Sequence, residues 1–187
     1  GSRTTQLRYL DLAECLRRNI KVVNIKAESS VLKKTFSTAE ETMALIFSVT
    51  RCLPWAFESV KKGNWERKKY GGIELMDKTI GLVGFGRLGR MVAKYSQAFG
   101  MHILAYDPYI SNTTMKSFGV KKTTLEKIFK GSDIISLHCV YDDKTLGMIR
   151  EGHFKSMKRT AFLINTARGE ITDESALLKA LKNKWLA

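Results

Sequence analysis

The sequence has no long apolar run and contains little cysteine. No stretch approaches the ~20 consecutive apolar residues that a membrane-spanning helix requires, and no secretory signal peptide opens the 187 residues. The three cysteines, Cys15, Cys52 and Cys139, lie far apart and lack metal-ligand spacing. Their odd number argues against a disulfide framework. We therefore expect a cytoplasmic protein with no membrane partner and no metal site.

Acidic residues are also few. The 18 aspartates and glutamates stand against 32 lysines and arginines, which gives a formal net charge of +14. Such an excess is compatible with a nucleic-acid partner. The basic residues are scattered, however, and the densest groups are residues 61–62 and 67–69, without a recognition helix or zinc spacing. A solvated basic face is the favoured interpretation, so we expect no nucleic-acid partner and keep nucleic-acid binding as a rival hypothesis.

The most informative motif is a glycine turn, residues 84–89, with the sequence GFGRLG. Its G-x-G-x-x-G spacing is a weak signal alone, but the apolar run 80–83 precedes it and apolar residues at helical spacing follow over 88–99. Gly84 permits a tight turn, Gly86 has no Cβ to obstruct a pyrophosphate, and Gly89 allows close packing of the helix on a sheet. The helix then begins with N–H groups that face two phosphates.

An acidic residue, Asp107, follows the next apolar run, residues 103–106, and lies 18 residues after Gly89. At the end of a second strand its carboxylate can accept hydrogen bonds from both hydroxyls of the adenosine ribose. The same carboxylate would repel a 2′-phosphate, so the sequence predicts NAD rather than NADP. The alternative is a glycine-rich turn beside a surface aspartate, without a dinucleotide.

Strands and helices alternate along the chain. A capping-box pattern at 37–40 opens a long helix that Pro54 should kink or break. The other expected helices cover 11–18, 88–99, 124–130, 151–157 and 172–186, with a second capping box at 123–126, and the expected strands cover 21–24, 80–83, 103–106, 133–137 and 161–165. The alternation predicts an α/β fold with a doubly wound parallel sheet of the Rossmann type.

Four blocks of the chain resemble the D-isomer-specific 2-hydroxyacid dehydrogenases, and among them most nearly the 3-phosphoglycerate dehydrogenase branch. The blocks are residues 63–70 (GNWERKKY), 84–89 with 106–108 (YDP), 136–139 (SLHC) and 164–169 (INTARG). The resemblance implies a partial, flavodoxin-like substrate domain over residues 1–36. It also implies an NAD-binding domain over 37–187, truncated at its C-terminal end, and a homodimer joined through the NAD-binding domains.

The resemblance also implies roles for single residues. The backbone of Arg87 and Leu88 would offer N–H groups to the pyrophosphate. His138 and Cys139 match the loop that lines the adenine and ribose side. The residues that match the loop beside the nicotinamide are Thr166, Ala167 and Arg168. Thr5 is a further match, to a threonine that reaches the cofactor from the substrate domain.

Arg168 is the residue to which we assign chemistry. Its guanidinium stays charged and offers a planar fork to a carboxylate. Beside the nicotinamide it can hold a 2-oxo acid and polarise the carbonyl group that receives hydride. The alternative is a surface ion pair at the end of a strand. In the family a histidine donates the proton and a glutamate orients it, and both match positions after Ala187.

Together these features predict an NAD-dependent oxidoreductase that interconverts a small-molecule 2-hydroxy acid and a 2-oxo acid, with the particular acid left open. This chain by itself is expected to bind NAD(H) and to turn over little. The alternative is a regulatory, NAD-sensing protein on the same fold, similar to the corepressors that resemble these dehydrogenases.

Overall fold

The computed structural model describes residue 7, residues 10–25 and residues 29–187, and Thr5 lies outside them. The chain divides into two compact units, residues 1–36 and residues 37–187. The first contains α1 (Leu12–Arg17), capped by the side chain of Asp11, and α2 (Ser30–Lys33). The strand predicted at 21–24 is wrong, because only a single bridge residue, Asn24, occurs there. Whether this unit belongs to a substrate domain stays a prediction.

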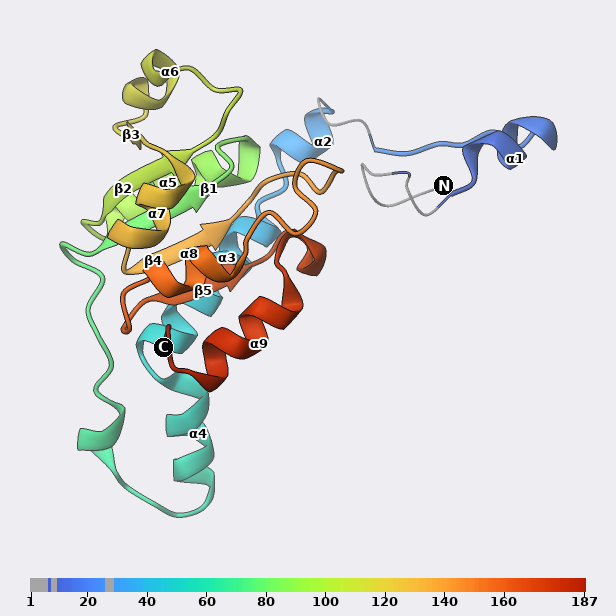
Figure 1. Ribbon diagram of the computed structural model, residues 1–187. Helices are drawn as coiled ribbons and strands as arrows, with labels where there is room; N and C mark the ends of the chain where they lie inside the picture. The colour runs from blue at the N-terminus through green and yellow to red at the C-terminus, as the bar shows by residue number, and fades with distance from the viewer. Residues whose placement is uncertain (1–6, 8–9, 26–28) are drawn as a thin grey trace. The chain divides into compact units, whose positions relative to one another are not determined.

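The second unit is built on a parallel sheet with the strand order β3-β2-β1-β4-β5 (Figure 1). The strands are β1 (Thr79–Val83), β2 (His102–Tyr106), β3 (Lys121–Lys122), β4 (Ile134–Leu137) and β5 (Phe162–Asn165). All four residues of β4 are buried, as expected for a strand covered on both faces. The predicted doubly wound α/β sheet is confirmed.

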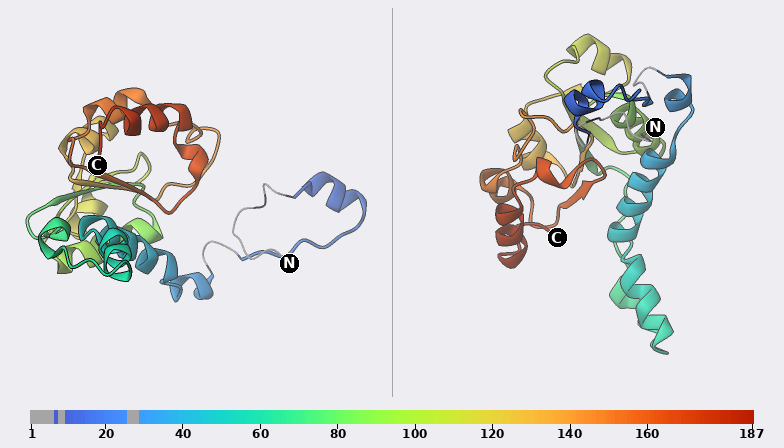
Figure 2. Two further views of the ribbon diagram at one scale, coloured as in Figure 1. Left: turned by 90° about the horizontal axis from the view of Figure 1, so that it is seen from below. Right: turned by 90° about the vertical axis from the view of Figure 1, so that its right-hand side faces the viewer.

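Helices cover both faces of the sheet, as Figure 2 shows. On one face α5 (Arg87–Ala98) packs on β1 and β2, α3 (Ser37–Thr50) packs on α5 and β5, and Leu82 points into this layer. On the other face α7 (Leu125–Gly131), α8 (Glu151–Ser156) and α9 (Glu174–Lys182) pack together, and Val83 points into that layer. The alternation of neighbouring strand residues therefore supplies two apolar cores from one sheet.

Pro54 ends the first long helix of this unit, as predicted. The chain leaves α3 at Thr50, Cys52 takes a left-handed conformation with φ 54°, and α4 (Leu53–Lys61) begins with Pro54 in its first turn. In the first turn of a helix the backbone N–H groups have no partner within the helix, so a proline, which has no N–H, loses no hydrogen bond there. A 3-10 turn, η1 (Arg67–Tyr70), follows, and α4 extends away from the sheet in both figures.

Three boundaries differ from the sequence-based expectations. Two short elements, α6 (Asn112–Ser117) and β3, lie between β2 and α7 where no helix or strand was expected, because β3 has only two basic residues and no apolar pattern. Thr124, not Thr123, caps α7, and its hydroxyl accepts from Lys127 N. The last helix is shorter than predicted because Asp173 caps its start and Lys184 has φ 52° just after its end.

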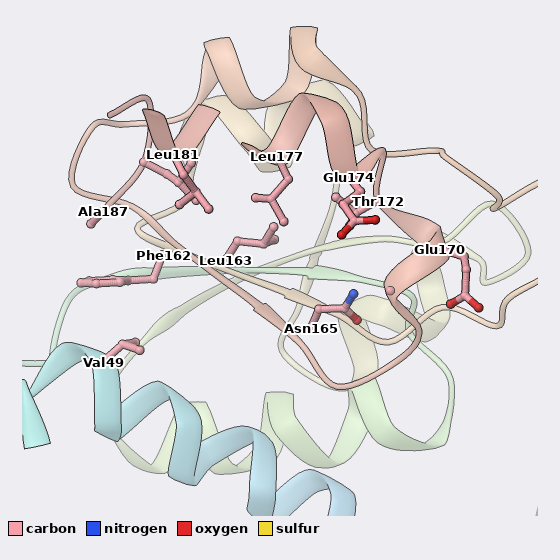
Figure 3. A pocket seen from close by; sticks show the side chains of 12 residues that line it. Val49, Phe162, Leu163, Asn165, Glu170, Thr172, Glu174, Leu177, Leu181 and Ala187 are labelled. Atoms are coloured by element: carbon pink, nitrogen blue, oxygen red, sulfur yellow. The ribbon is translucent and has the colours of Figure 1, made fainter. Parts of the chain in front are cut away.

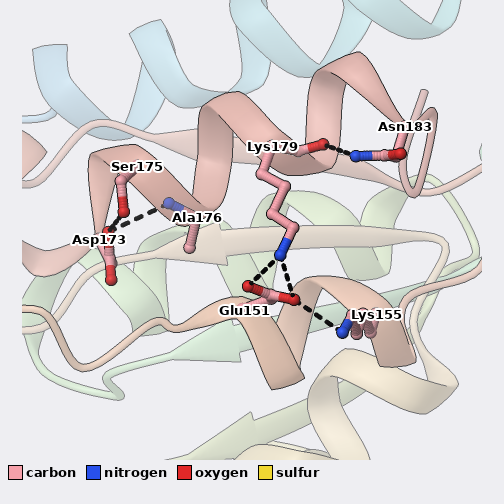
Figure 4. A network of polar contacts seen from close by, with 7 residues as sticks. All are labelled: Glu151, Lys155, Asp173, Ser175, Ala176, Lys179 and Asn183. Atoms are coloured by element: carbon pink, nitrogen blue, oxygen red, sulfur yellow. Dashed lines mark hydrogen bonds and ion pairs between the residues drawn. The ribbon is translucent and has the colours of Figure 1, made fainter.

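A network of exposed charges joins α8 to α9 (Figure 4). The carboxylate of Glu151 lies 2.7 Å from Lys155 Nζ within α8 and 2.9 Å from Lys179 Nζ of α9. The two ammonium groups hold the pKa of Glu151 below its ordinary value. Both also lie near the ring of Trp185, at 5.2 Å and 6.0 Å from its centroid. These side chains link α8 and α9 at the surface.

Candidate functional site

The glycine turn begins directly at the carboxyl end of β1. Gly84 has φ +97°, and a Cβ on it would lie 2.6 Å from Cys139 N, so only glycine fits there. A Cβ on Gly89 would lie 2.3 Å from Gly84 O, because the first turn of α5 rests on the turn itself. A Cβ on Gly86 would meet no atom within 4 Å. Gly86 is thus the one glycine of the three whose bare face is open to a ligand.

The start of α5 has the properties of an anion site. Gly86 is the N-cap and has no side chain to cap the helix, and the first helical bond runs from Arg90 N to Gly86 O. The N–H groups of a first helical turn and the helix dipole both favour a phosphate. Arg90 lies 5.1 Å from the Phe118 ring centroid and donates to Phe85 O at 3.2 Å, which braces the turn.

Asp107 follows β2 at the same edge of the sheet. Its Oδ2 accepts from Phe85 N at 2.8 Å, and its Oδ1 accepts from Tyr109 N at 2.9 Å. These two bonds fix the carboxylate beside the glycine turn. Each oxygen keeps further lone pairs, so the group can still accept hydrogen bonds from ligand hydroxyls.

A pocket of about 380 Å³ opens between these segments and the loop after β4. Five of the predicted site residues line it: Gly84, Gly86, Asp107, His138 and Cys139. The pocket also has residues that were not predicted as site residues, namely Val83, Tyr106, Pro108, Tyr109, Val140, Asp142, Lys144, Thr145 and Met148. Tyr106 and Pro108 belong to the block 106–108 that resembles the family, and Val83 and Tyr106 are the last residues of β1 and β2. No sequence signal indicated Asp142, Lys144, Thr145 or Met148. Lys144 Nζ lies 3.5 Å from Tyr109 Oη, so the two loops meet at this pocket.

His138 and Cys139 are uncharged components of the pocket wall. Burial lowers the pKa of His138 to about 4, and its Nε2 lies 2.9 Å from Ser136 Oγ. Burial also raises the pKa of Cys139 to about 11. At neutral pH the wall therefore carries a neutral imidazole and a neutral thiol, which suits a pocket for an uncharged base or sugar and not acid–base chemistry.

The other six predicted residues do not line that pocket. Arg87, Leu88 and Gly89 form the first turn of α5, and Thr166, Ala167 and Arg168 lie in the loop after β5. The Asn165 side chain accepts from Ala167 N at 3.0 Å and donates to Arg168 O at 2.9 Å, which fixes the loop. Arg168 donates from Nη1 to Ala167 O at 2.8 Å, and within the described residues it forms no ion pair with a carboxylate. The hydroxyl oxygen of Thr166 lies 2.9 Å from the hydroxyl oxygen of Thr42 on α3. The sequence did not indicate Thr42 as a site residue.

A second hollow, of about 620 Å³, runs along the free edge of β5 (Figure 3). Val49 of α3 lies on one side of it and Leu177 and Leu181 of α9 on the other, with Asn165 and Glu170 at one end. Its wall is largely aliphatic and includes no lysine or arginine. It has no cation in its wall, and the helix start that reaches it, that of α9, is already capped by Asp173 and carries Glu174. The pocket at the glycine turn therefore fits a phosphate-bearing ligand better than this hollow does.

Residues 7, 10–25 and 29–187 offer neither a metal cluster nor a membrane-spanning helix. No group of three histidine, cysteine or acidic side chains is placed there to hold a metal ion. None of the helices in those ranges combines the length and the apolar character needed to cross a bilayer. His153 is used structurally, since its Nδ1 accepts from Arg150 N at 3.1 Å and its ring packs on Phe129.

Comparison with known proteins identifies the family. The profile described as "D-isomer specific 2-hydroxyacid dehydrogenase, NAD binding domain" matches residues 43–187. The chain belongs to this family. It is 42% identical over 173 residues to D-3-phosphoglycerate dehydrogenase of Archaeoglobus fulgidus, covering 92% of this chain and 32% of that protein. It is 40% identical over 183 residues to the human enzyme of the same name, covering 98% of this chain and 33% of that protein.

Solved structures of related dehydrogenases share the fold. The apo structure of D-lactate dehydrogenase from Escherichia coli has a TM-score of 0.88 at 28% identity, covering 97% of this chain and 56% of that one. D-lactate dehydrogenase from Aquifex aeolicus, complexed with NAD and lactic acid, has a TM-score of 0.84 at 36% identity, covering 98% and 54%. This chain spans about a third of the length of the curated relatives named above.

The cofactor of this domain is NAD, and the residues present fit it. The open face of Gly86, the uncapped start of α5 and the fixed carboxylate of Asp107 have the geometry and polarity that a pyrophosphate next to a ribose requires. The site residues on β1, β2, β4 and β5 all follow the carboxyl end of their strand, where ligands of such sheets bind.

Proposed function

We propose that this domain serves an oxidoreductase that interconverts a 2-hydroxy acid and a 2-oxo acid, with NAD as the hydride carrier. The observation that supports it best is the position of Arg168. It lies in the loop that follows β5, at the edge that carries the glycine turn and Asp107, and it is not neutralised by a carboxylate of the described residues. The relatives described above bear the names of dehydrogenases, and none of them supports the corepressor alternative.

The strand order suggests how the dinucleotide lies. Asp107 at the end of β2 would hold the adenosine ribose, with His138 and Cys139 in the wall of the adenosine pocket. The pyrophosphate would lie at Gly86 and the first backbone N–H groups of α5, those of Arg87, Leu88 and Gly89. Since β1 and β4 flank the switch point of the sheet, the nicotinamide half would extend across it toward Thr166, Ala167 and Arg168.

Arg168 is then placed to act on the substrate. A guanidinium can bind the carboxylate of the acid through two parallel N–H···O bonds and stays protonated at any working pH. The same cation polarises the neighbouring carbonyl group, where negative charge develops on oxygen as C2 receives hydride. When bound, NAD supplies or accepts that hydride. The proton on the hydroxyl oxygen has to come from another group, because arginine keeps its own.

Two measurements test this function. Calorimetric titration should show binding of NADH and at least tenfold weaker binding of NADPH, and absence of NADH binding would overturn the proposal. In the intact enzyme, Arg168→Ala should lower turnover of the acid that it accepts, 3-phosphoglycerate and D-lactate being the first to test, by two orders of magnitude or more. NADH affinity should stay nearly constant. An unchanged rate would remove Arg168 from the chemistry.

We also propose a homodimer and a cytoplasmic location. The arm, which we define as residues 53–70, exposes more than half of the surface of five large apolar side chains: Leu53, Trp55, Phe57, Val60 and Trp65. Apolar side chains gathered in this way are typical of a protein interface. Cys15, Cys52 and Cys139 are free thiols, which is compatible with a reducing compartment.

A further inference from the structure

A buried hydroxyl on α3 connects that helix to the loop after β5. The side chain of Thr42 is fully buried, and its Oγ1 lies 2.8 Å from Thr38 O, one helical turn earlier. The same oxygen lies 2.9 Å from Oγ1 of Thr166, a residue 124 positions later in the chain. Thr42 is therefore the point at which α3 holds the first residue beyond β5.

The chemistry of the three groups gives this chain of contacts a direction. A carbonyl oxygen such as that of Thr38 can only accept, and a hydroxyl has a single hydrogen to donate. For both contacts to be hydrogen bonds, Thr42 must donate to Thr38 O and Thr166 must donate to Thr42. The hydroxyl of Thr166 has then used its hydrogen, and the capacity left to it is that of an acceptor.

The backbone around Thr166 is fixed as well. Asn165 accepts from Ala167 N and donates to Arg168 O, so the loop is held on both sides of the threonine hydroxyl. Thr166 itself is half-buried and lies at the carboxyl edge of the sheet. An oriented acceptor on a rigid loop selects for a ligand that brings an N–H or O–H donor.

We propose that Thr42 is a positioning residue that holds Thr166 as a hydrogen-bond acceptor for the carboxamide N–H of the nicotinamide. The inference rests on the proposed function, because the strand order there directs the nicotinamide half toward β5. The carboxamide NH₂ is the neutral donor on the nicotinamide ring, and it matches an acceptor without a hydrogen to give. Thr42 thus influences the binding of the nicotinamide through Thr166, from a buried position on α3 and without contacting the ligand.

The test compares two ligands that differ in that donor. NADH has a carboxamide, whereas reduced 3-acetylpyridine adenine dinucleotide has a methyl group in place of the NH₂. The wild-type chain should bind NADH about three to ten times more tightly than this analogue, the value of one neutral hydrogen bond. Thr166→Val should abolish that preference by weakening NADH binding alone. Thr42→Val should at least halve it, because Thr166 can then turn its hydrogen toward the ligand, and Thr42→Ser should restore it.

A matched control is available on the same helix. Thr50 is also buried, and its hydroxyl donates to Ile46 O within α3 at 2.7 Å, so Thr50→Val removes an equivalent hydroxyl and should leave the preference unchanged. The inference is overturned if Thr42→Val leaves the preference intact, or if it weakens both ligands equally, as a packing defect would. A wild-type chain that binds neither ligand would overturn the proposed function as well, whereas wild-type NADH binding with an unchanged preference in Thr42→Val overturns the inference alone.

Discussion

Gly84 and Gly86 are two residues apart, yet an added methyl group would meet different surroundings at each. At Gly84 it would strike the backbone of Cys139 at 2.6 Å on a residue with φ +97°. At Gly86 it would project into open space at the start of α5. The first glycine is required for folding, and the second is required only by a ligand that approaches the backbone closely.

Alanine at the two positions should therefore separate folding from binding. Gly84→Ala should lower the free energy of unfolding by about 2 kcal/mol or more, because the clash and the left-handed backbone act together. Gly86→Ala should leave the thermal midpoint within about 1 °C of wild type and weaken NADH binding at least tenfold. Thermal unfolding and fluorescence titration of both variants provide the check. A stable Gly86→Ala variant with wild-type affinity would contradict the assignment of the phosphate site.

His138 makes stability depend on pH. Burial lowers its pKa to about 4 in the folded chain, below the ordinary value of 6.5. As the pH falls below 6.5, the unfolded chain takes up the proton first. The stability that the neutral histidine contributes is thus complete above pH 6.5 and is lost between pH 6.5 and 4.

Urea unfolding at several pH values tests this linkage. Between pH 7 and pH 4 the wild-type chain should lose on the order of 3 kcal/mol through His138 alone. His138→Asn should show a flatter profile over the same range. Titrating carboxylates such as Asp133 add a loss at the acid end, but they do so in both proteins, so the difference between the profiles isolates the histidine. Parallel profiles would show that His138 accepts a proton freely in the folded state.

Two acidic side chains tie elements together, but in different environments. Asp133, just before β4, accepts from Thr79 N of β1 at 2.8 Å and pairs with Lys158 Nζ at 2.7 Å. Burial by itself raises the pKa of Asp133, and the Lys158 ammonium and the Thr79 N–H outweigh it, so that the pKa is lowered. Glu151 contacts only exposed lysines on α8 and α9. Both carboxylates form short ion pairs, but solvent screens those of Glu151 far more than that of Asp133.

The two should differ accordingly when they are replaced. Asp133→Ala leaves the Thr79 N–H and the Lys158 ammonium without their acceptor, which costs about 1–3 kcal/mol and lowers the midpoint by roughly 3–10 °C. Glu151→Gln should change the midpoint by no more than about 2 °C. Calorimetric melting of both variants under one buffer condition is sufficient. If both variants lowered the midpoint equally, the ion pairs of Glu151 between α8 and α9 would have to be shielded from solvent, contrary to the exposure of their side chains.

Long or buried elements could be predicted from their own residues, whereas short or exposed ones could not. The apolar runs of β1 and β4 correctly predicted strands, and Pro54 correctly predicted a break in the long helix, because each signal acts locally and strongly. β3 has only two residues, both lysines, and forms through pairing with β2. The strand expected at 21–24 has the right residue types, but the structure gives it only one bridge residue. In both segments the presence or absence of a neighbouring strand to pair with determined whether a strand formed, and the strand preferences of the residues did not predict it.

At the scale of the whole molecule the proposed dimer is the main prediction. If the arm, residues 53–70, joins two copies, Phe57→Asp combined with Trp65→Ser should convert a dimer to a monomer at micromolar concentration, because buried charge and lost apolar area both oppose association. Sedimentation velocity distinguishes the two states. Leu178→Ser is a suitable control, since Leu178 is 53% exposed but lies on α9. The proposal would be contradicted if the intact wild-type protein itself sedimented as a monomer.

The sequence by itself determined the glycine turn, the acidic residue after the second strand and the alternation of strands and helices. Each of these depends on residues close together in the chain, where steric freedom, capping and periodicity act directly. Only the tertiary structure decided which loops share a pocket. It placed Lys144 against Tyr109, and it joined Thr42 to Thr166 across 124 positions. Such contacts arise from the strand order of the sheet, which brings distant strand ends to one edge and leaves no trace in local spacing.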